Sequence, residues 1–135
     1  MPKIGHMVLC ENVLKSDEEN KTVIMAPFSN LDVPEFPSKV SFMVSIGLFN
    51  LPPETTLMCA FFLYSPKGEM MESNFFDIAT SSNQNSIHLT LTVKLTDVNF
   101  TLEGPHNFRF QIANLNEEKS TFFYVKQSVQ GDEHE

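Results

Sequence analysis

Hydrophobic and polar residues alternate along most of the second half of this chain. Every odd position from 87 to 95 is apolar, and runs with the same two-residue period follow at 98–102, 106–113 and 120–126. Successive side chains of a pleated strand point to opposite sides, so this pattern buries one face of each strand. We therefore expect these segments to be β-strands that pack around one interior.

The first half of the chain predicts five more strands. We expect them at 7–14, 22–28, 40–48, 57–64 and 69–79, the last two joined as a hairpin by the turn Ser65-Pro-Lys-Gly68. Between the second and third of these, residues 29–38 carry Pro34 and Pro37. Proline cannot donate a ladder hydrogen bond, so this segment is predicted to be a surface crossover between strands.

The apolar positions change from odd to even between 95 and 98, which predicts a bend or bulge at Thr96 and Asp97. About eight short strands separated by turns, with no helical periodicity, indicate an antiparallel β-sandwich of the immunoglobulin-like or Greek-key kind. A small β-barrel is the alternative. We expect a single domain over residues 1–126, followed by a disordered acidic tail at 127–135.

Composition narrows the classes of partner. The 135 residues include 13 Phe and no Trp, which is enough aromatic mass for a core. The formal net charge is −8, and Arg109 is the one arginine. Because binding to phosphates requires clustered Lys and Arg, we expect neither direct nucleic-acid binding nor attachment to an anionic membrane.

Cys10 and Cys59 lie far apart and match no metal-binding or redox spacing. They are predicted to be buried, reduced thiols. The first residues lack the pattern of a secretory signal, and no segment reaches about 18 apolar residues. These features predict a cytoplasmic protein.

Short motifs along most of the chain resemble a family of small bacterial and phage proteins of unknown function. The motifs are LCEN at 9–12, FSNLDVPEFP at 28–37, YSPKG at 64–68, VNF at 98–100 and FFYV at 122–125. The resemblance implies an immunoglobulin-like or synaptotagmin-type sandwich and brings no catalytic residue. It also implies an aromatic soon after Gly104, as at a tyrosine corner, where His106 and Phe108 stand in this chain.

No combination of residues predicts a reaction. The four histidines are isolated along the chain, whereas zinc needs three or four ligands that are commonly paired at short spacing. His88 lies on the polar face of its strand, and His106 shares the apolar face of Phe108. We expect an exposed and a partly buried histidine, respectively.

Neither nucleophilic catalysis nor metal binding has a strong sequence signal. Serines occur without a GxSxG motif. The remaining alternative for nucleophilic catalysis is a triad whose residues come from distant strands. Residues 17–19 are acidic and could bind calcium at a loop together with Asp32, Asp77 or Asp97, although a solvated loop is the simpler interpretation. We expect no enzyme activity, cofactor or metal.

Four apolar doublets are the most informative feature. They are Phe61-Phe62, Met70-Met71, Phe75-Phe76 and Phe122-Phe123. Adjacent residues of a strand face opposite ways, so one member of each pair must point away from the core unless a loop covers it or a bulge intervenes. Exposed aromatic and Met residues are typical of protein interfaces. The predicted interaction residues are Phe62, Met71, Phe75 and Phe122.

The function predicted from these features is a non-enzymatic interaction module, an accessory protein of a bacterium or phage that binds another protein or itself as a homodimer. One alternative is an acidic mimic of nucleic acid, with carboxylates at 11, 17–19, 103, 117 and 118 on one face. Another is a sandwich that binds calcium or carbohydrate through its loops.

Overall fold

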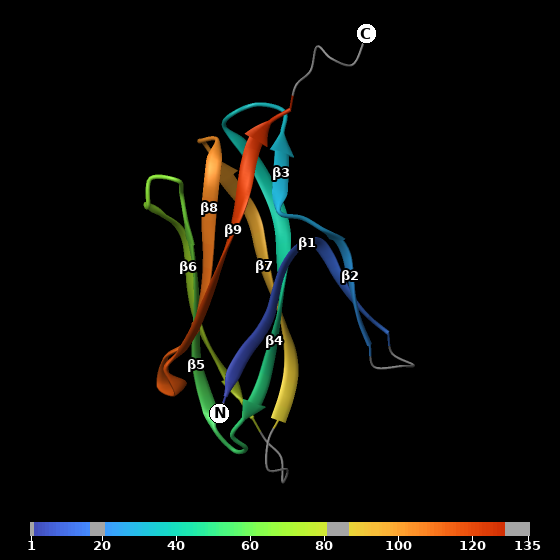
Figure 1. Ribbon diagram of the computed structural model, residues 1–135, viewed down its shortest axis with the longest axis vertical. Helices are drawn as coiled ribbons and strands as arrows, with labels where there is room; N and C mark the ends of the chain where they lie inside the picture. Colours follow the sequence, from blue (N-terminus) through green and yellow to red (C-terminus); the bar gives the residue numbers. More distant parts are fainter. Residues whose placement is uncertain (1, 17–20, 81–86, 129–135) are drawn as a thin grey trace.

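The computed structural model describes residues 2–16, 21–80 and 87–128 as two open, packed β-sheets (Figure 1). The four-stranded sheet has the order β2-β1-β4-β7, formed by β1 (Lys3–Ser16), β2 (Lys21–Pro27), β4 (Ser38–Leu51) and β7 (Ile87–Phe100). The five-stranded sheet has the order β3-β9-β8-β5-β6, formed by β3 (Asn30–Val33), β9 (Glu117–Gln127), β8 (Gly104–Ile112), β5 (Thr56–Tyr64) and β6 (Met70–Ala79). The predicted β-sandwich is confirmed, and the described strands do not close into a barrel.

The crossover predicted at 29–38 contains a further strand, β3, which brings the count in the described ranges to nine. β3 runs parallel to β9, with Asn30 opposite Tyr124. The amide of Ser128 donates to the carbonyl of Val33 at 2.7 Å, which ties the chain beyond β9 to the same edge. Four residues directly before Pro34 are too few to show a period-two pattern, so the sequence did not reveal this strand.

The bend predicted at Thr96 and Asp97 is confirmed. β7 runs through it as one strand, but its register against β4 shifts between Val40 and Phe42. Asp97 has a φ of 51°, and its amide donates to Ser41 Oγ at 2.9 Å. This irregularity moves the buried face from odd to even positions, so that both Leu95 and Val98 enter the core.

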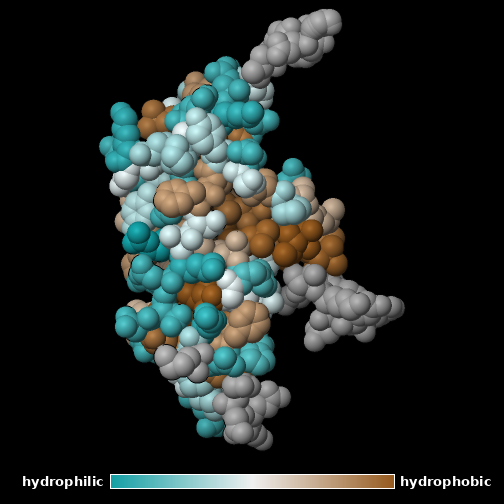
Figure 2. Space-filling view, in the orientation of Figure 1, coloured by the Kyte–Doolittle hydropathy of each residue, from teal (hydrophilic) through white to brown (hydrophobic). Residues whose placement is uncertain are grey.

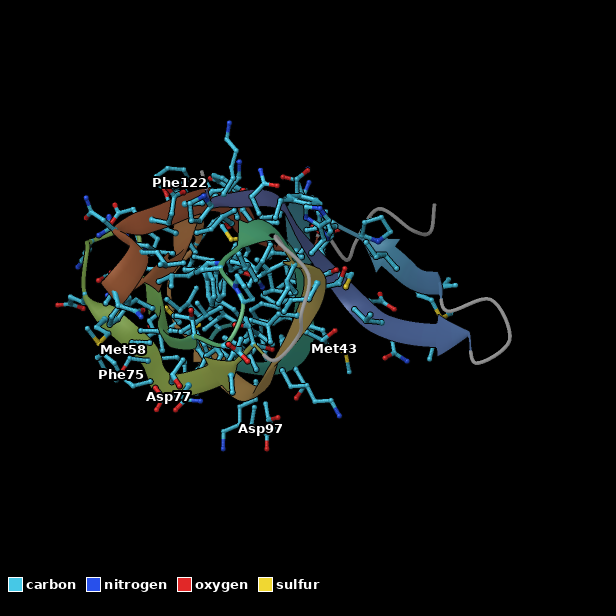
Figure 3. The ribbon with its side chains drawn as sticks, turned by 90° about the horizontal axis from the view of Figure 1, so that it is seen from below. Met43, Met58, Phe75, Asp77, Asp97 and Phe122 are labelled. Atoms are coloured by element: carbon cyan, nitrogen blue, oxygen red, sulfur yellow. The ribbon has the colours of Figure 1, made fainter. Side chains whose placement is uncertain are left out.

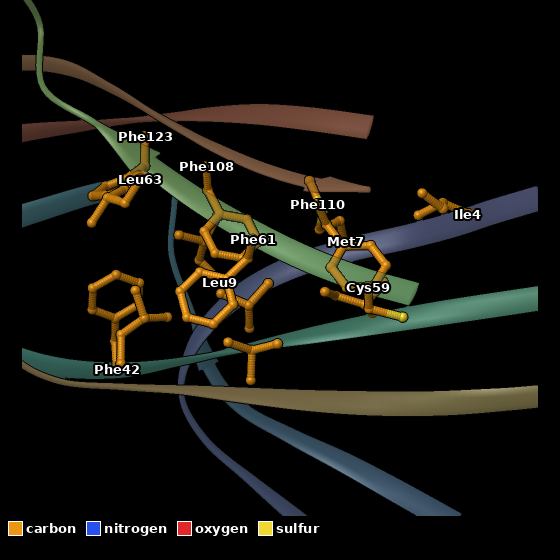
Figure 4. Packing of buried hydrophobic residues seen from close by; sticks show 14 of the residues in the cluster. Ile4, Met7, Leu9, Phe42, Cys59, Phe61, Leu63, Phe108, Phe110 and Phe123 are labelled. Carbon is orange, nitrogen blue, oxygen red and sulfur yellow. The ribbon is translucent and has the colours of Figure 1, made fainter. Parts of the chain in front are cut away.

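Phenylalanines from both sheets fill the interior (Figure 4). The ring centroids of Phe42 and Phe100 lie 6.3 Å apart within the four-stranded sheet. Phe123 of the opposite sheet contacts both rings edge-on. Towards the middle of the five-stranded sheet, Phe61 stacks on Phe108 with ring centroids 5.7 Å apart. Such aromatic contacts across the two layers explain how a chain without Trp builds a well-filled core.

The hairpin of β1 and β2 projects beyond the sandwich. β1 pairs with β4 only as far as Cys10, and from there to Ser16 its partner is β2 alone. Leu14, Val23 and Met25 are exposed on this two-stranded arm. Figure 2 shows apolar side chains gathered where the arm leaves the body.

Both cysteines are buried and free, as predicted. Gln127 still belongs to β9, so the strand extends into the segment expected to be a tail, and residues 129–135 of that segment lie outside the described ranges. In the described ranges the helical element is the short 3-10 turn η1 (Ala113–Leu115), and no helix there is long and apolar enough to span a membrane.

Candidate protein-interaction surface

The outer side of the five-stranded sheet carries large apolar side chains. Phe75 is 71% exposed, Phe122 65%, Met70 55%, Met58 54% and Tyr124 41%. Figure 3 shows Met58, Phe75 and Phe122 pointing away from the interior. We use the term outer face for the surface formed by Met58, Phe62, Tyr64, Met70, Phe75, Arg109, Phe122 and Tyr124.

The alternation of side chains along the strands explains why these residues lie outside. Phe123 is buried in the core while Phe122 beside it is exposed, and Phe76 packs against the core while Phe75 faces out. On β5, Phe61 is buried and Phe62 is partly exposed. The three phenylalanine doublets therefore divide between the two sides of the sheet as predicted.

Met71 is the predicted interaction residue that the structure places elsewhere. It packs partly buried against the hydrophobic core, and its neighbour Met70 is the exposed member of the doublet. The reason is an irregularity in the β5–β6 pairing, where Leu63 lies opposite Glu72 but Tyr64 lies opposite Met70. The extra residue reverses the expected orientation, so Met70 replaces Met71 on the outer face.

Aromatic rings on the outer face contact one another. Phe62 of β5 meets Phe75 of β6 edge-on, with ring centroids 5.7 Å apart and planes at 81°. Phe62 also stacks with Tyr64, with ring centroids 6.3 Å apart and an interplanar angle of 25°. These contacts hold the side chains in a defined arrangement, which lowers the entropy that they lose when a partner binds.

Arg109 of β8 lies among these rings. Its guanidinium carbon is 5.6 Å from the centre of the Tyr64 ring, within the range of a cation–π contact. Its Nε is buried and has no hydrogen-bond partner among the described residues. A buried donor without an acceptor costs free energy, which an acceptor supplied by a partner would recover.

A groove of about 490 Å³ runs beside Arg109 between the β5–β6 turn and β9, lined by Tyr64, Pro66, Pro105, Asn107, Arg109 and Phe122. A second hollow of about 320 Å³ lies further along the same sheet, beside Ala60, Phe75 and Asp77. The outer face therefore has both projecting aromatic rings and two hollows. This relief suits docking with a shaped protein surface.

Besides Met70, sequence reasoning missed Met58, Tyr64, Arg109 and Tyr124 as members of the outer face. The signal for Arg109 was present: it is the one arginine, and it stands at the outward position between the buried Phe108 and Phe110. Tyr124 alternates with Phe123 and Val125 in the same way. None of the four residues belongs to one of the apolar doublets on which the prediction depended.

The histidines occupy separate structural positions. His106 is 1% exposed, and its Nδ1 lies 3.0 Å from the carbonyl of Gly104. Burial lowers its pKa, while the Gly104 contact acts in the opposite direction. His88 is exposed and its Nδ1 accepts the Asn50 amide at 3.1 Å. His88 is exposed as predicted, whereas His106 is more deeply buried than the partly buried side chain that the sequence predicted.

The acidic residues proposed for calcium lie on different strands, Asp32 on β3, Asp77 on β6 and Asp97 on β7. Residues 17–19 lie outside the described ranges. Within those ranges no three His, Cys, Asp or Glu side chains gather as a metal site.

The carboxylates proposed for a nucleic-acid mimic are also dispersed. Glu103 comes just before the start of β8, whereas Glu117 pairs with Ile112 at its end. Glu11 belongs to the projecting arm. The described carboxylates of this set therefore lie on separate elements and at different ends of the strands.

Comparison with known proteins identifies a family whose function is unknown. The sequence model of this family, DUF6941, matches residues 6–126 and so covers both sheets. No curated protein matches the chain.

Proposed function

Because this chain belongs to the DUF6941 family of unknown function, we propose its function from its own surface: it is a non-enzymatic interaction module that binds a protein through the outer face. The observation that carries the proposal is the exposure of Phe75 and Phe122 beside the half-buried Arg109. A solvated sheet face normally carries polar side chains, and this one carries the residue types enriched in protein interfaces.

The outer face also has the organisation of a binding hot spot. Met58, Tyr64 and Arg109 lie near the aromatic contact between Phe62 and Phe75. Polar residues such as Ser73 and Asn107 lie between and around them. Large anchors near the centre of a patch contribute most of the binding free energy, while polar neighbours exclude water.

We also propose that the sandwich is immunoglobulin-like. The order β9-β8-β5-β6 agrees with the G-F-C-C′ order of variable-type immunoglobulin sheets, and β4 and β7 are neighbours in the other sheet as strands B and E are. The sheet that contains C, C′, F and G corresponds to the one with the outer face. The free thiols of Cys10 and Cys59 support a cytoplasmic location, and the motif resemblance supports a bacterial or phage source.

The proposal is tested by capture followed by direct titration. Immobilised protein is cross-linked in bacterial extract, and each captured protein is purified and titrated against the wild type and against a Phe75→Ser/Phe122→Ser variant. We expect the variant to bind at least about tenfold more weakly, because two exposed anchors are removed.

The matched control is Leu14→Ser/Val23→Ser, which removes two exposed apolar side chains from the projecting arm. It should bind as tightly as the wild type. Equal affinity of the wild type and the Phe75→Ser/Phe122→Ser variant, or loss of binding only in the arm variant, would overturn the proposal.

A further inference from the structure

We propose that the groove beside β3 binds an extended polypeptide segment of a partner, which adds to the free edge of β3 as a further strand. The segment presents lysine or arginine side chains to Asp32. The groove has a volume of about 540 Å³ and is lined by residues 30–32 of β3, residues 40–42 of β4, Phe28 and Glu11. We use the term edge groove for it. It shares no residue with the outer face, so the inference goes beyond the proposed function.

The edge groove opens where β1 leaves the body of the sandwich (Figure 1). β1 pairs with β4 as far as Cys10, opposite Met43, and from there its partner is β2 alone. Residues 38–42 of β4 therefore pair with β7 on one side, and no described strand of the same sheet pairs with them on the other. β3 is the terminal strand of the opposite sheet and lines the same space. Both sheets thus have an unpaired strand edge at the groove.

The free edge of β3 presents main-chain groups to the edge groove. The carbonyl of Ser29 accepts the Tyr124 amide at 2.9 Å, so it points towards β9. Main-chain groups of consecutive strand residues point to alternate sides, so Asn30 and Asp32 direct their N–H and C=O groups away from β9 and into the groove. In the described ranges no strand pairs with this side of β3.

The spacing of these main-chain groups indicates a polypeptide as the ligand. Asn30 and Asp32 are two residues apart, which is about 6.6 Å along a strand at about 3.3 Å per residue. An extended polypeptide repeats its own N–H and C=O groups on one side at the same interval, so it can pair with both residues at once. Addition of a strand to an exposed sheet edge is a known mode of peptide recognition. Because β3 has four residues, the added strand is short.

Apolar side chains form the inner wall of the edge groove. Phe28, Leu31 and Val40 are partly buried and pack against the hydrophobic core. Phe28 meets the buried Phe42 edge-on, with ring centroids 5.8 Å apart. Side chains of a strand alternate between two faces, so every second residue of the added strand lies on the inner side, as Leu31 does. Apolar residues at those positions would remove this wall from water.

The rim of the edge groove is acidic. Glu11 and Asp32 are its charged lining residues, and both are exposed. Lys126 is opposite Asp32 on β9, on the side of β3 away from the groove. Opposite charges on neighbouring strands stabilise their pairing, and the net charge of −8 attracts a basic segment over a longer range. The residues that alternate with the apolar ones are therefore lysine or arginine.

The test uses a synthetic peptide, TKVKVKVT with blocked ends, which is titrated into the protein by calorimetry and in backbone amide spectra of ¹⁵N-labelled protein. We expect saturable binding, with amide shifts in β3 and at residues 38–42 of β4. Asp32→Lys should weaken binding at least about fivefold, because it places like charges on neighbouring strands. Glu72→Lys makes the same charge change at an exposed position on β6 and should bind as the wild type does.

Two further peptides test the main-chain pairing without any change in the protein. One carries N-methyl groups on its valines and the other on its lysines, and these two sets of amides face opposite edges of the added strand. The peptide whose methyl groups face β3 should lose at least about tenfold in affinity, because it can no longer donate to the edge. The other should bind as the parent peptide does.

Three results would each overturn the inference: no saturable binding below about 1 mM peptide, equal affinities of the two N-methylated peptides, or equal affinities of Asp32→Lys and Glu72→Lys. Amide shifts confined to β5, β6 and β8 would place the peptide on the outer face and would also overturn it. The proposed function is judged separately, because the capture experiment depends on Phe75 and Phe122, which lie outside the edge groove.

Discussion

His106 and Phe123 stack in the core, with ring centroids 5.6 Å apart and an interplanar angle of 28°. Phe100 meets the imidazole edge-on at 5.1 Å. Among the residues that the structure describes, the imidazole has one polar contact, that of Nδ1 with the Gly104 carbonyl. Surroundings of this kind favour the neutral ring, because burial removes the water that would solvate its charge.

This stacking predicts a loss of stability in acid. Burial lowers the pKa of His106 in the folded protein below its ordinary value of 6.5, so below that pH the unfolded chain binds more protons. The free energy of unfolding should fall with pH from about 6.5 downwards, by at most about 1.4 kcal/mol per pH unit from this residue. Urea unfolding at about pH 7.5 and pH 5.5 measures the effect. His106→Phe should show a weaker fall, and an unchanged fall would contradict the assignment.

Two Phe→Ala substitutions should differ strongly in cost. Phe108 is fully buried and stacks on Phe61, so Phe108→Ala should reduce the free energy of unfolding by about 3–5 kcal/mol. Phe75→Ala removes an exposed ring and should cost less than about 1 kcal/mol. Chemical denaturation at low protein concentration, where any dimer has dissociated, provides the comparison. Similar costs for the two would mean that Phe75 is not a surface residue.

Gly104 should resist substitution more than Gly68. Its φ is 136°, and an added Cβ would come within 3.1 Å of the Pro66 ring. Gly68 also has a positive φ, 82°, but an added Cβ there meets no atom within 4 Å. We expect Gly68→Ala to cost about 1 kcal/mol and Gly104→Ala to cost more, which thermal unfolding can rank. The reverse order would contradict the contact between the β5–β6 turn and β8.

Both thiols should be inert in the folded protein. Burial, and to a lesser degree the Asp77 carboxylate, raises the pKa of Cys59 to about 11, and burial raises the pKa of Cys10. Because the thiolate is the reactive form, an aromatic disulfide reagent at about pH 8 should label neither residue until guanidinium unfolds the chain. Rapid labelling of either thiol in the native protein would disprove its burial.

Much of the fold could be predicted because alternation is a direct consequence of strand geometry. The run from 87 to 95 and the bend at Thr96 and Asp97 both follow from which side each residue must face. β3 was missed because its four residues pair with β9, far away in sequence, and a single edge contact leaves no local pattern. Sheet partners of this kind are set by the tertiary structure.

The candidate surface was predicted less completely. Doublets identified Phe62, Phe75 and Phe122, since one residue of two must face out. Met71 was chosen in place of Met70 because the bulge beside Tyr64 depends on the pairing of β5 with β6. The position of Arg109 over the Tyr64 ring likewise requires β8 to lie next to β5. Neighbouring strands decide these features, and the sequence of one strand does not.

The central claim is that the outer face is where this protein binds, and a titration with a captured binding partner tests it most directly. Backbone amide spectra of ¹⁵N-labelled protein should change on addition of that partner in β5, β6, β8 and β9, most strongly around Phe75, Arg109 and Phe122. The amides of β1, β4 and β7 should stay in place. Changes confined to the four-stranded sheet or the projecting arm would contradict the account.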